Sequence, residues 1–281
     1  MDSAFAKLGR ANAHRDHFSA DVTKFDEQYP HEWQFVEVEA PEPMLASYEV
    51  TVRVTQGLPS EWSLIIGDIL TNLRAALDHA LFSHATSRRR LTEDEEKRLQ
   101  YPIVTERENW FGAAAVPATA TAPRQPRIES KRDKLAPFVN TKVLDVIEKS
   151  QPFNNKRMPA QSDPLAVLNS LVNHDKHREV RVVSWLNEEF TIRHSTWKVE
   201  EISAPQTEIV DGATIARVIV RRGISLPWQQ ANLRGGQFDV LTGYGPSIKA
   251  PDGSYLSARL AMNVMVKHVE RTLHKLKRAI S

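Results

Sequence analysis

Two stretches of the sequence concentrate side chains that could bind an anion or move a proton. The first is 67–84 (GDILTNLRAALDHALFSH), which reads as an amphipathic helix. Its polar side carries Asp68, Asn72, Arg74, Asp78 and His79. The opposite arc is apolar and comprises Ile66, Ile69, Leu70, Leu73, Leu77, Ala80 and Leu81. Arg74 and Asp78 are i,i+4 neighbours that can form an ion pair. Chemistry, if this chain performs any, is expected to start on this helix face.

The second stretch is a dense polar run at the carboxyl end of a later predicted helix: Asn169, Asn173, His174, Asp175, Lys176, His177 and Arg178. Asn169, Asn173 and His177 follow the i, i+4, i+8 spacing of one helical stripe. Cations in a last helical turn satisfy free carbonyls and complement the helix dipole. Their density beside the apolar LAVL segment instead favours a phosphate or carboxylate site. Both interpretations stay open.

The segment Arg74-Ala-Ala-Leu-Asp78-His79 resembles the Arg-x4-His motif of the HEPN superfamily, helical bundles of which many are metal-independent ribonucleases of toxin and antiphage systems. The resemblance implies that Arg74 stabilises charge on a scissile phosphate and that His79 is the general base or acid. Asp78 and Asn72 would orient them. It also implies RNA as the substrate, a homodimer that assembles the site, and an antitoxin or other protein partner.

We expect the two polar stretches to face each other, so that Arg74, His79, His174, Lys176, His177 and Arg178 converge on one phosphate-sized pocket. The resulting hypothesis is a metal-independent endoribonuclease that needs no cofactor. Its catalytic residues would be Arg74, His79 and His177. The supporting or phosphate-binding residues would be Asn72, Asp78, Asn173, His174, Lys176 and Arg178.

Two other functions use the same residues. In the first, Arg, Asp and His side chains form a buried polar network in a binding or structural protein without catalysis. In the second, the adjacent pair His174-Asp175, which resembles the metal ligands of HD-type phosphohydrolases, binds a divalent ion. Lys176 and Arg178 would repel such a cation.

The hydrophobic patterns predict an α+β protein of one elaborated domain. Helices are expected near 3–28, 59–85, 138–177 and 255–280. The third is interrupted at Gln151-Pro152 and resumes at an Asp163-Pro164 cap. The apolar residues of the last helix are expected to face the core: Leu256, Leu260, Met262, Val264, Met265, Val269, Leu273, Leu276 and Ile280. An antiparallel hairpin (33–39 and 47–55) and a β-meander before the C-terminal helix, with a hairpin turn at Asp211-Gly212, complete the pattern. The helical core would comprise 1–30, 59–177 and 253–281, the β segments 33–55 and 178–250, and a mobile loop 112–127.

Composition narrows the function classes further. The 281 residues include no Cys, which excludes disulfides and thiolate sites, and the net charge is only +2. No leader or membrane-spanning run is visible, so we expect a cytoplasmic protein without a membrane partner. The balanced charge neither favours nor opposes nucleic acid, although the C-terminal helix is locally basic, with Lys267, Arg271, Lys275, Lys277 and Arg278.

Overall fold

The structure, a computed structural model, is α+β and describes residues 1–114, 127–175, 180, 182–186, 190–194, 198–205, 207–221, 239–241, 244–250 and 254–280. The chain forms two compact units. Unit 1 comprises Met1–Phe18, Ser63–Val180 and Arg259–Ser281, and unit 2 comprises Ser19–Trp62 and Arg181–Ala258. The segments expected to form a helical core correspond broadly to unit 1, and most of the β segments belong to unit 2.

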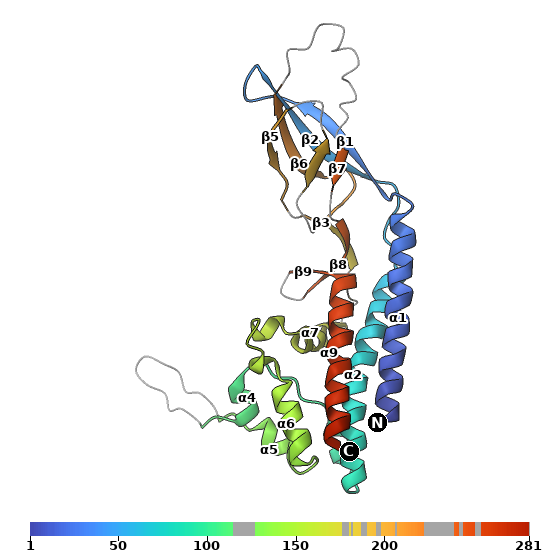
Figure 1. Cartoon of the computed structure of the whole chain (residues 1–281), viewed down its shortest axis with the longest axis vertical. Coiled ribbons are helices and arrows are strands. Elements are labelled where there is room, and N and C mark those ends of the chain that lie inside the picture. The colour runs from blue at the N-terminus through green and yellow to red at the C-terminus, as the bar shows by residue number, and fades with distance from the viewer. Residues whose placement is uncertain are drawn as a thin grey trace, which may run out of the picture. The chain divides into compact units, whose positions relative to one another are not determined.

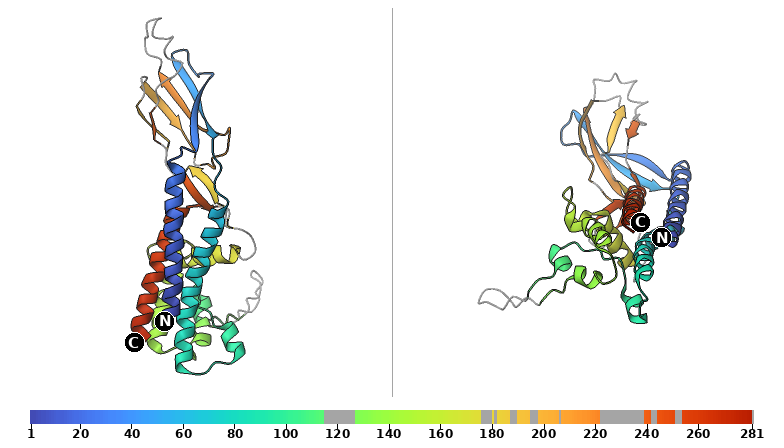
Figure 2. Two further views of the ribbon diagram at one scale, coloured as in Figure 1. Left: turned by 90° about the vertical axis from the view of Figure 1, so that its right-hand side faces the viewer. Right: turned by 60° about the horizontal axis from the view of Figure 1, so that its bottom comes forward.

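The helices of the described residues are α1 (Asp2–Asp26), α2 (Glu61–Arg88), α3 (Glu93–Arg98), α4 (Arg107–Phe111), α5 (Lys131–Leu135), α6 (Thr141–Lys149), α7 (Pro164–Asp175) and α9 (Ala258–Ile280). In unit 1, α2 and α9 lie side by side with their carboxyl ends at one end of the bundle, where α1 begins (Figures 1 and 2). The predicted helical region 138–177 contains α6 and α7. Two short 3-10 turns, Pro152–Asn154 and Ala160–Ser162, separate them.

The apolar arc predicted for α2 forms the centre of the unit 1 core. Its members are all at most 1% exposed: Ile66, Ile69, Leu70, Leu73, Leu77, Ala80 and Leu81. The Asp163-Pro164 cap is also confirmed, because the Asp163 carboxylate accepts the Leu165 N–H at 2.9 Å at the start of α7. These two local features fix the positions of the helices that carry the polar stretches.

The prediction for α9 was wrong at two positions. Leu260 and Val264, expected in the core, are 63% and 42% exposed. At 100° per residue they lie about 160° and 200° around the helix from buried Met262. The buried face is therefore the narrower arc that contains Met262, Met265, Val266, Val269, Leu273 and Leu276.

The strands of unit 2 are β1 (His31–Val38), β2 (Leu45–Val54), β3 (Val182–Leu186), β4 (Thr191–His194), β5 (Lys198–Ser203), β6 (Thr214–Arg221), β7 (Asp239–Leu241), β8 (Tyr244–Lys249) and β9 (Tyr255–Ser257). In the described residues they form antiparallel sheets with the orders β1-β2-β6-β5, β3-β8-β9 and β4-β7. The predicted hairpin β1-β2 is confirmed. Later strands pair in a nested pattern, β5 with β6, β4 with β7 and β3 with β8.

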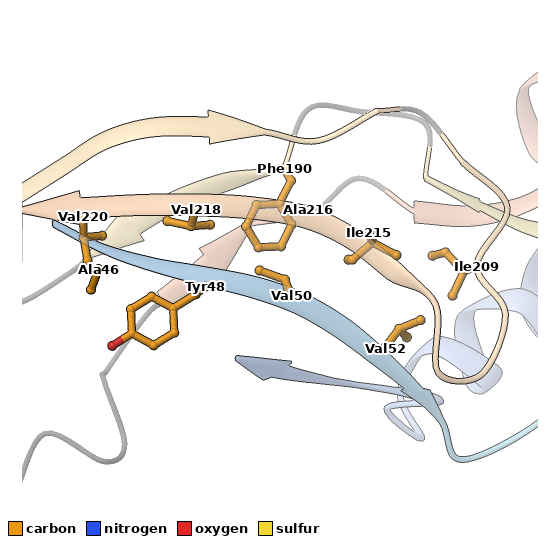
Figure 3. Close-up of a cluster of buried hydrophobic side chains, with 10 residues drawn as sticks. All are labelled: Ala46, Tyr48, Val50, Val52, Phe190, Ile209, Ile215, Ala216, Val218 and Val220. Carbon is orange, nitrogen blue, oxygen red and sulfur yellow. The ribbon is translucent and has the colours of Figure 1, made fainter. Parts of the chain in front are cut away.

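The larger sheet buries one face. Alternate residues of β2 and β6, among them Val50, Val52 and Val218, contribute to a cluster with Phe190 (Figure 3). The predicted turn at Asp211-Gly212 precedes β6 and is hydrogen-bonded to β2. Gly212 has φ +75°, and the Asp211 carboxylate accepts the Val54 N–H at 2.8 Å. Residues 115–126 of the expected mobile loop lie outside the described residues.

Candidate functional site

Arg74 and Asp78, the charged pair of the α2 motif, together hold the backbone of one distant residue. Arg74 Nε donates to Asp78 Oδ2 at 3.1 Å, and the two side chains are 14% and 26% exposed. Arg74 Nη2 donates to the Tyr101 carbonyl at 2.8 Å, while Asp78 Oδ1 accepts the Tyr101 N–H at 2.7 Å. Both main-chain groups of Tyr101 are therefore satisfied by this ion pair, which we call the Tyr101 clamp.

The polar sides of α2 and α7 approach each other, as the sequence predicted. Arg74 Nη1 donates to Asn169 Oδ1 at 3.4 Å. One end of α7 also lies against α2, because a Cβ atom added at Gly67 would stand 3.1 Å from the Asp175 carboxylate. Because the Asn169 side-chain oxygen accepts a hydrogen bond from Arg74, the two N–H groups of its amide remain available as donors.

A cavity of about 730 Å³ opens beside Arg74 within unit 1. Its walls come from α2, α3, α5 and α7 and from the segments that follow α3 and α5. The lining residues are Arg74, Asp94, Glu95, Arg98, Leu99, Gln100, Tyr101, Pro102, Ile103, Lys131, Lys134, Leu135, Phe138, Asn169 and Asn173. This volume lies within the range of small-molecule sites, roughly 300–1,000 Å³.

Two cations of the cavity wall have no ion-pair partner among the described residues, Arg98 on α3 and Lys131 on α5. The other charges are mostly compensated. Lys134 pairs with Glu129 and Arg74 with Asp78. Glu95 accepts from Arg89, and this hydrogen bond lowers the pKa of Glu95 to about 2. Asp94 is the remaining acidic residue of the lining, so the uncompensated charge of the wall is positive.

His79 has a different neighbour from Arg74. Its Nδ1 shares a 2.7 Å hydrogen bond with Ser3 Oγ of α1, and its side chain is partly exposed. His79 follows Arg74 by five positions, which places the two about 140° apart around α2. Within one chain, the structure brings Arg74 together with Asn169 and Asn173, whereas His79 faces α1.

The remaining predicted residues divide into two groups. Asn72 is buried, and its amide donates to the Asp68 carbonyl of its own helix at 2.8 Å. Asn173 is exposed on the cavity wall and His174 is half-buried at the end of α7. Lys176, His177 and Arg178 lie outside the described residues. Within the described ranges, no three His, Asp or Glu side chains gather closely enough to hold a metal ion.

Burial shifts the pKa of two side chains near these elements. Desolvation raises the pKa of the Tyr101 phenol, which shares a hydrogen bond with the Ser150 hydroxyl. Desolvation, assisted by Arg88, lowers the pKa of His84 on α2. His84 Nε2 accepts the Asn140 N–H at 3.2 Å, so the neutral imidazole fits this position.

Sequence reasoning missed most of the cavity wall. Arg98 and Lys131 belong to the charged runs EDEEKR and KRDKL, whose composition is typical of solvated surface helices. Leu135 ends the five-residue helix α5 and Phe138 lies in the turn that follows it, so neither stands in a helix long enough for its buried face to be predicted. A usable signal was the i,i+4 pair Asn169 and Asn173, which did mark the face of α7 that lines the cavity.

Comparisons of the chain with protein-family models, with curated proteins and with solved structures find no match. None of the helices in the described ranges has the length and apolar character needed to cross a bilayer.

Proposed function

We propose that unit 1 binds a small anionic molecule with an apolar or aromatic part, the class to which nucleoside monophosphates belong. The observation that carries this proposal is the cavity beside Arg74, whose wall combines uncompensated Arg98 and Lys131 with the amides of Asn169 and Asn173. Guanidinium, ammonium and amide N–H groups are the donors that bind phosphate and carboxylate oxygens. This proposal is a specific form of the non-catalytic binding protein considered from the sequence.

Other residues of the lining suit a ring or other apolar group. Leu99 and Leu135 are buried, and Phe138, Pro102 and Ile103 are partly exposed. Pockets for small molecules commonly combine such apolar walls with a few fixed polar groups. Arg89 makes a cation–π contact with the Phe138 ring, in which the guanidinium carbon lies 4.9 Å from the ring centroid.

Arg74 acts in this proposal mainly as a positioning residue. Each of its nitrogens donates to a protein acceptor, and Asp78 compensates its charge. It holds Tyr101 and Asn169, which line the cavity, in place. The residues expected to touch the ligand are Arg98, Lys131 and Asn173, since no hydrogen bond joins their side chains to other described residues.

The test is thermal unfolding of the full chain with adenosine monophosphate, with adenosine and with inorganic phosphate. A ligand at a hundred times its dissociation constant stabilises the folded state by about 2.7 kcal/mol. This corresponds to a rise in Tm of roughly 5–10 °C. We expect adenosine monophosphate to raise Tm more than either part alone, because only the whole molecule engages both the cationic and the apolar lining residues.

A neighbouring pair of residues supplies the matched control. Arg98→Glu should abolish the rise in Tm, whereas Lys97→Glu should retain it, because Lys97 precedes Arg98 on the same exposed helix but does not line the cavity. Equal loss in both variants would mean that net charge alone drives binding. The absence of any rise with the wild-type chain, or an equal rise with adenosine, would contradict the proposal.

RNA cleavage is the second candidate function, and the observation in its favour is the environment of His79. The imidazole is partly exposed and its Nδ1 is fixed by Ser3, an arrangement that suits proton transfer through the other ring nitrogen. Arg74 faces the cavity and His79 faces α1, so one chain does not bring the two to the same phosphate. This function therefore requires a homodimer, in which the second copy supplies the other residue of the pair.

Cleavage of a labelled RNA in the presence of a chelator tests this candidate. His79→Ala should abolish cleavage at unchanged Tm, and His14→Ala, which alters another partly exposed histidine of unit 1, should leave it intact. Cleavage that survives in His79→Ala would exclude the assignment.

A further inference from the structure

The carboxyl ends of α2 and α9 and the amino end of α6 meet around Asn140. The Asn140 N–H donates to His84 Nε2 of α2, and its side-chain amide donates to the Ala279 carbonyl of α9 at 3.5 Å. Its Oδ1 caps α6 by accepting the Val143 N–H at 2.7 Å. Figure 1 shows the ends of α2 and α9 together at this end of the bundle. Charged residues on these three segments therefore share one surface.

This surface is strongly cationic. Its exposed members, which we call the basic surface, are Arg88, Arg90, Lys142, Arg271, Lys275 and Arg278. The sequence has no acidic residue between Asp78 and Glu93, and none after Glu270. Arg89 is compensated by Glu95, and Asp2 is the acidic residue in the first turn of α1. In the part of the chain that the structure describes, no ion pair joins a member of the basic surface to a carboxylate.

Helix capping alone does not account for so many cations. Each helix carboxyl end has an effective charge of about −0.5, so the ends of α2 and α9 together contribute about −1. Asp2 and the exposed Asp145, one turn after Lys142 on α6, contribute a further −2 against the six positive charges of the basic surface. A surplus of about +3 remains on a chain whose total charge is only +2.

We infer that the basic surface binds the phosphate backbone of nucleic acid. Arg271, Lys275 and Arg278 follow the i, i+4, i+7 spacing, so they form a stripe about 10 Å long on the exposed side of α9. Such a row of cations can contact successive phosphates without reading the bases. This inference does not depend on the ligand proposed for the cavity, which α3, α5 and α7 line elsewhere in unit 1.

A nucleic acid fits this surface better than a membrane. Peripheral helices bind bilayers by inserting large apolar side chains as well as by charge. The exposed large apolar residues of unit 1 are Leu64, Phe82, Phe111, Met158, Leu260 and Val264, and none belongs to 83–90, 137–142 or 268–280. Leu260 and Val264 lie on the same side of α9 as Arg271 but two or more turns nearer its amino end, and Phe82 precedes Arg88 by nearly two turns of α2. No large apolar side chain is therefore interspersed among the cations of the Arg271, Lys275 and Arg278 stripe, which matches a hydrated phosphate chain.

The test is fluorescence anisotropy of the full chain with a labelled 20-nucleotide single-stranded RNA and with a duplex DNA of the same length, titrated at several salt concentrations. The variant Arg271→Glu/Lys275→Glu/Arg278→Glu should bind at least tenfold more weakly at low salt. Three lost phosphate contacts should also reduce the slope of log K against log salt by about 2 for single-stranded RNA. Circular dichroism checks that the variant is folded.

The control carries the same change in net charge at exposed positions of unit 1 away from this surface, Lys97→Glu/Lys149→Glu/Lys156→Glu. It should lose less than threefold in affinity. Three outcomes would overturn the inference: no binding of either nucleic acid by the wild-type chain, equal losses in the two triple variants, or binding to anionic phospholipid vesicles that depends on the basic surface while nucleic acid binding does not.

Discussion

Replacing Asp78 by alanine tests the Tyr101 clamp, in which an ion pair of α2 holds the main chain of a segment 23 residues later. The substitution removes the acceptor of the Tyr101 N–H and leaves Arg74 with only the Tyr101 carbonyl and Asn169 Oδ1 as partners. Arg74 would then hold a positive charge at 14% side-chain exposure without a counter-ion.

The size of the effect follows from this intermediate burial. Exposed ion pairs contribute about 0–1 kcal/mol, and breaking a fully buried pair costs about 3–5 kcal/mol. Exposures of 14% and 26%, with one additional hydrogen bond from a main-chain N–H, place Asp78→Ala between these limits. We expect a loss of about 2–4 kcal/mol in the free energy of unfolding, and a fall in Tm of roughly 4–16 °C.

Thermal unfolding of Asp78→Ala, Arg74→Ala and the double variant measures the coupling between the two residues. The double variant should lose less than the sum of the single variants, because each single variant leaves a charge without its partner. Asp145→Ala, an exposed carboxylate on α6, is the control and should stay within about 0.5 kcal/mol of wild type. A loss for Asp78→Ala no larger than that of the control would refute the clamp.

Three further predictions concern stability. A Cβ at Gly67 would meet the Asp175 carboxylate at 3.1 Å. Gly67→Ala should therefore raise the free energy of unfolding by the usual 0.5–1 kcal/mol of a helical alanine only when it is combined with Asp175→Ala. Chemical denaturation of the two single variants and the double variant measures this. Gly212→Ala should cost about 1–2 kcal/mol through its φ of +75° alone, since its Cβ would meet nothing within 4 Å, and melting curves should show the loss. Burial lowers the pKa of His84 below 6.5, so the unfolded chain binds the proton more readily than the folded chain. The free energy of unfolding should therefore fall as the pH drops below 6.5, and it should fall less steeply in His84→Gln. Denaturant midpoints measured across pH 5–8 check this.

Local patterns predicted the helices well because their signals are short in range. The apolar arc of α2 was read residue by residue from its 3.6-residue period, and the cap of α7 from the dipeptide Asp163-Pro164. The same reasoning failed at Leu260 and Val264, because an apolar side chain contributes to a helical pattern even where no neighbouring element covers it.

The site was predicted only where a regular helix determined the spacing. Arg74, Asp78 and Asn169 were identified because i,i+4 arithmetic gives the face of each helix. The acceptor of Arg74 is a backbone carbonyl in an irregular segment, and every residue carries such a carbonyl, so the sequence contains no signal for it. The convergence of Arg98 and Lys131 depends on the tertiary packing of two short helices, which composition does not encode.

The pairing of β2 with β6 has a consequence for synthesis on the ribosome. Val50 and its partner Ala216 are separated by about 166 residues, so β2 leaves the exit tunnel long before β6 has been translated. At about 5–20 residues per second, the delay amounts to roughly 8–33 s. During that time the nascent hairpin β1-β2 exposes the edge and the apolar face that β6 later covers. A chaperone that covers this edge on the ribosome should therefore raise the yield of folded chain.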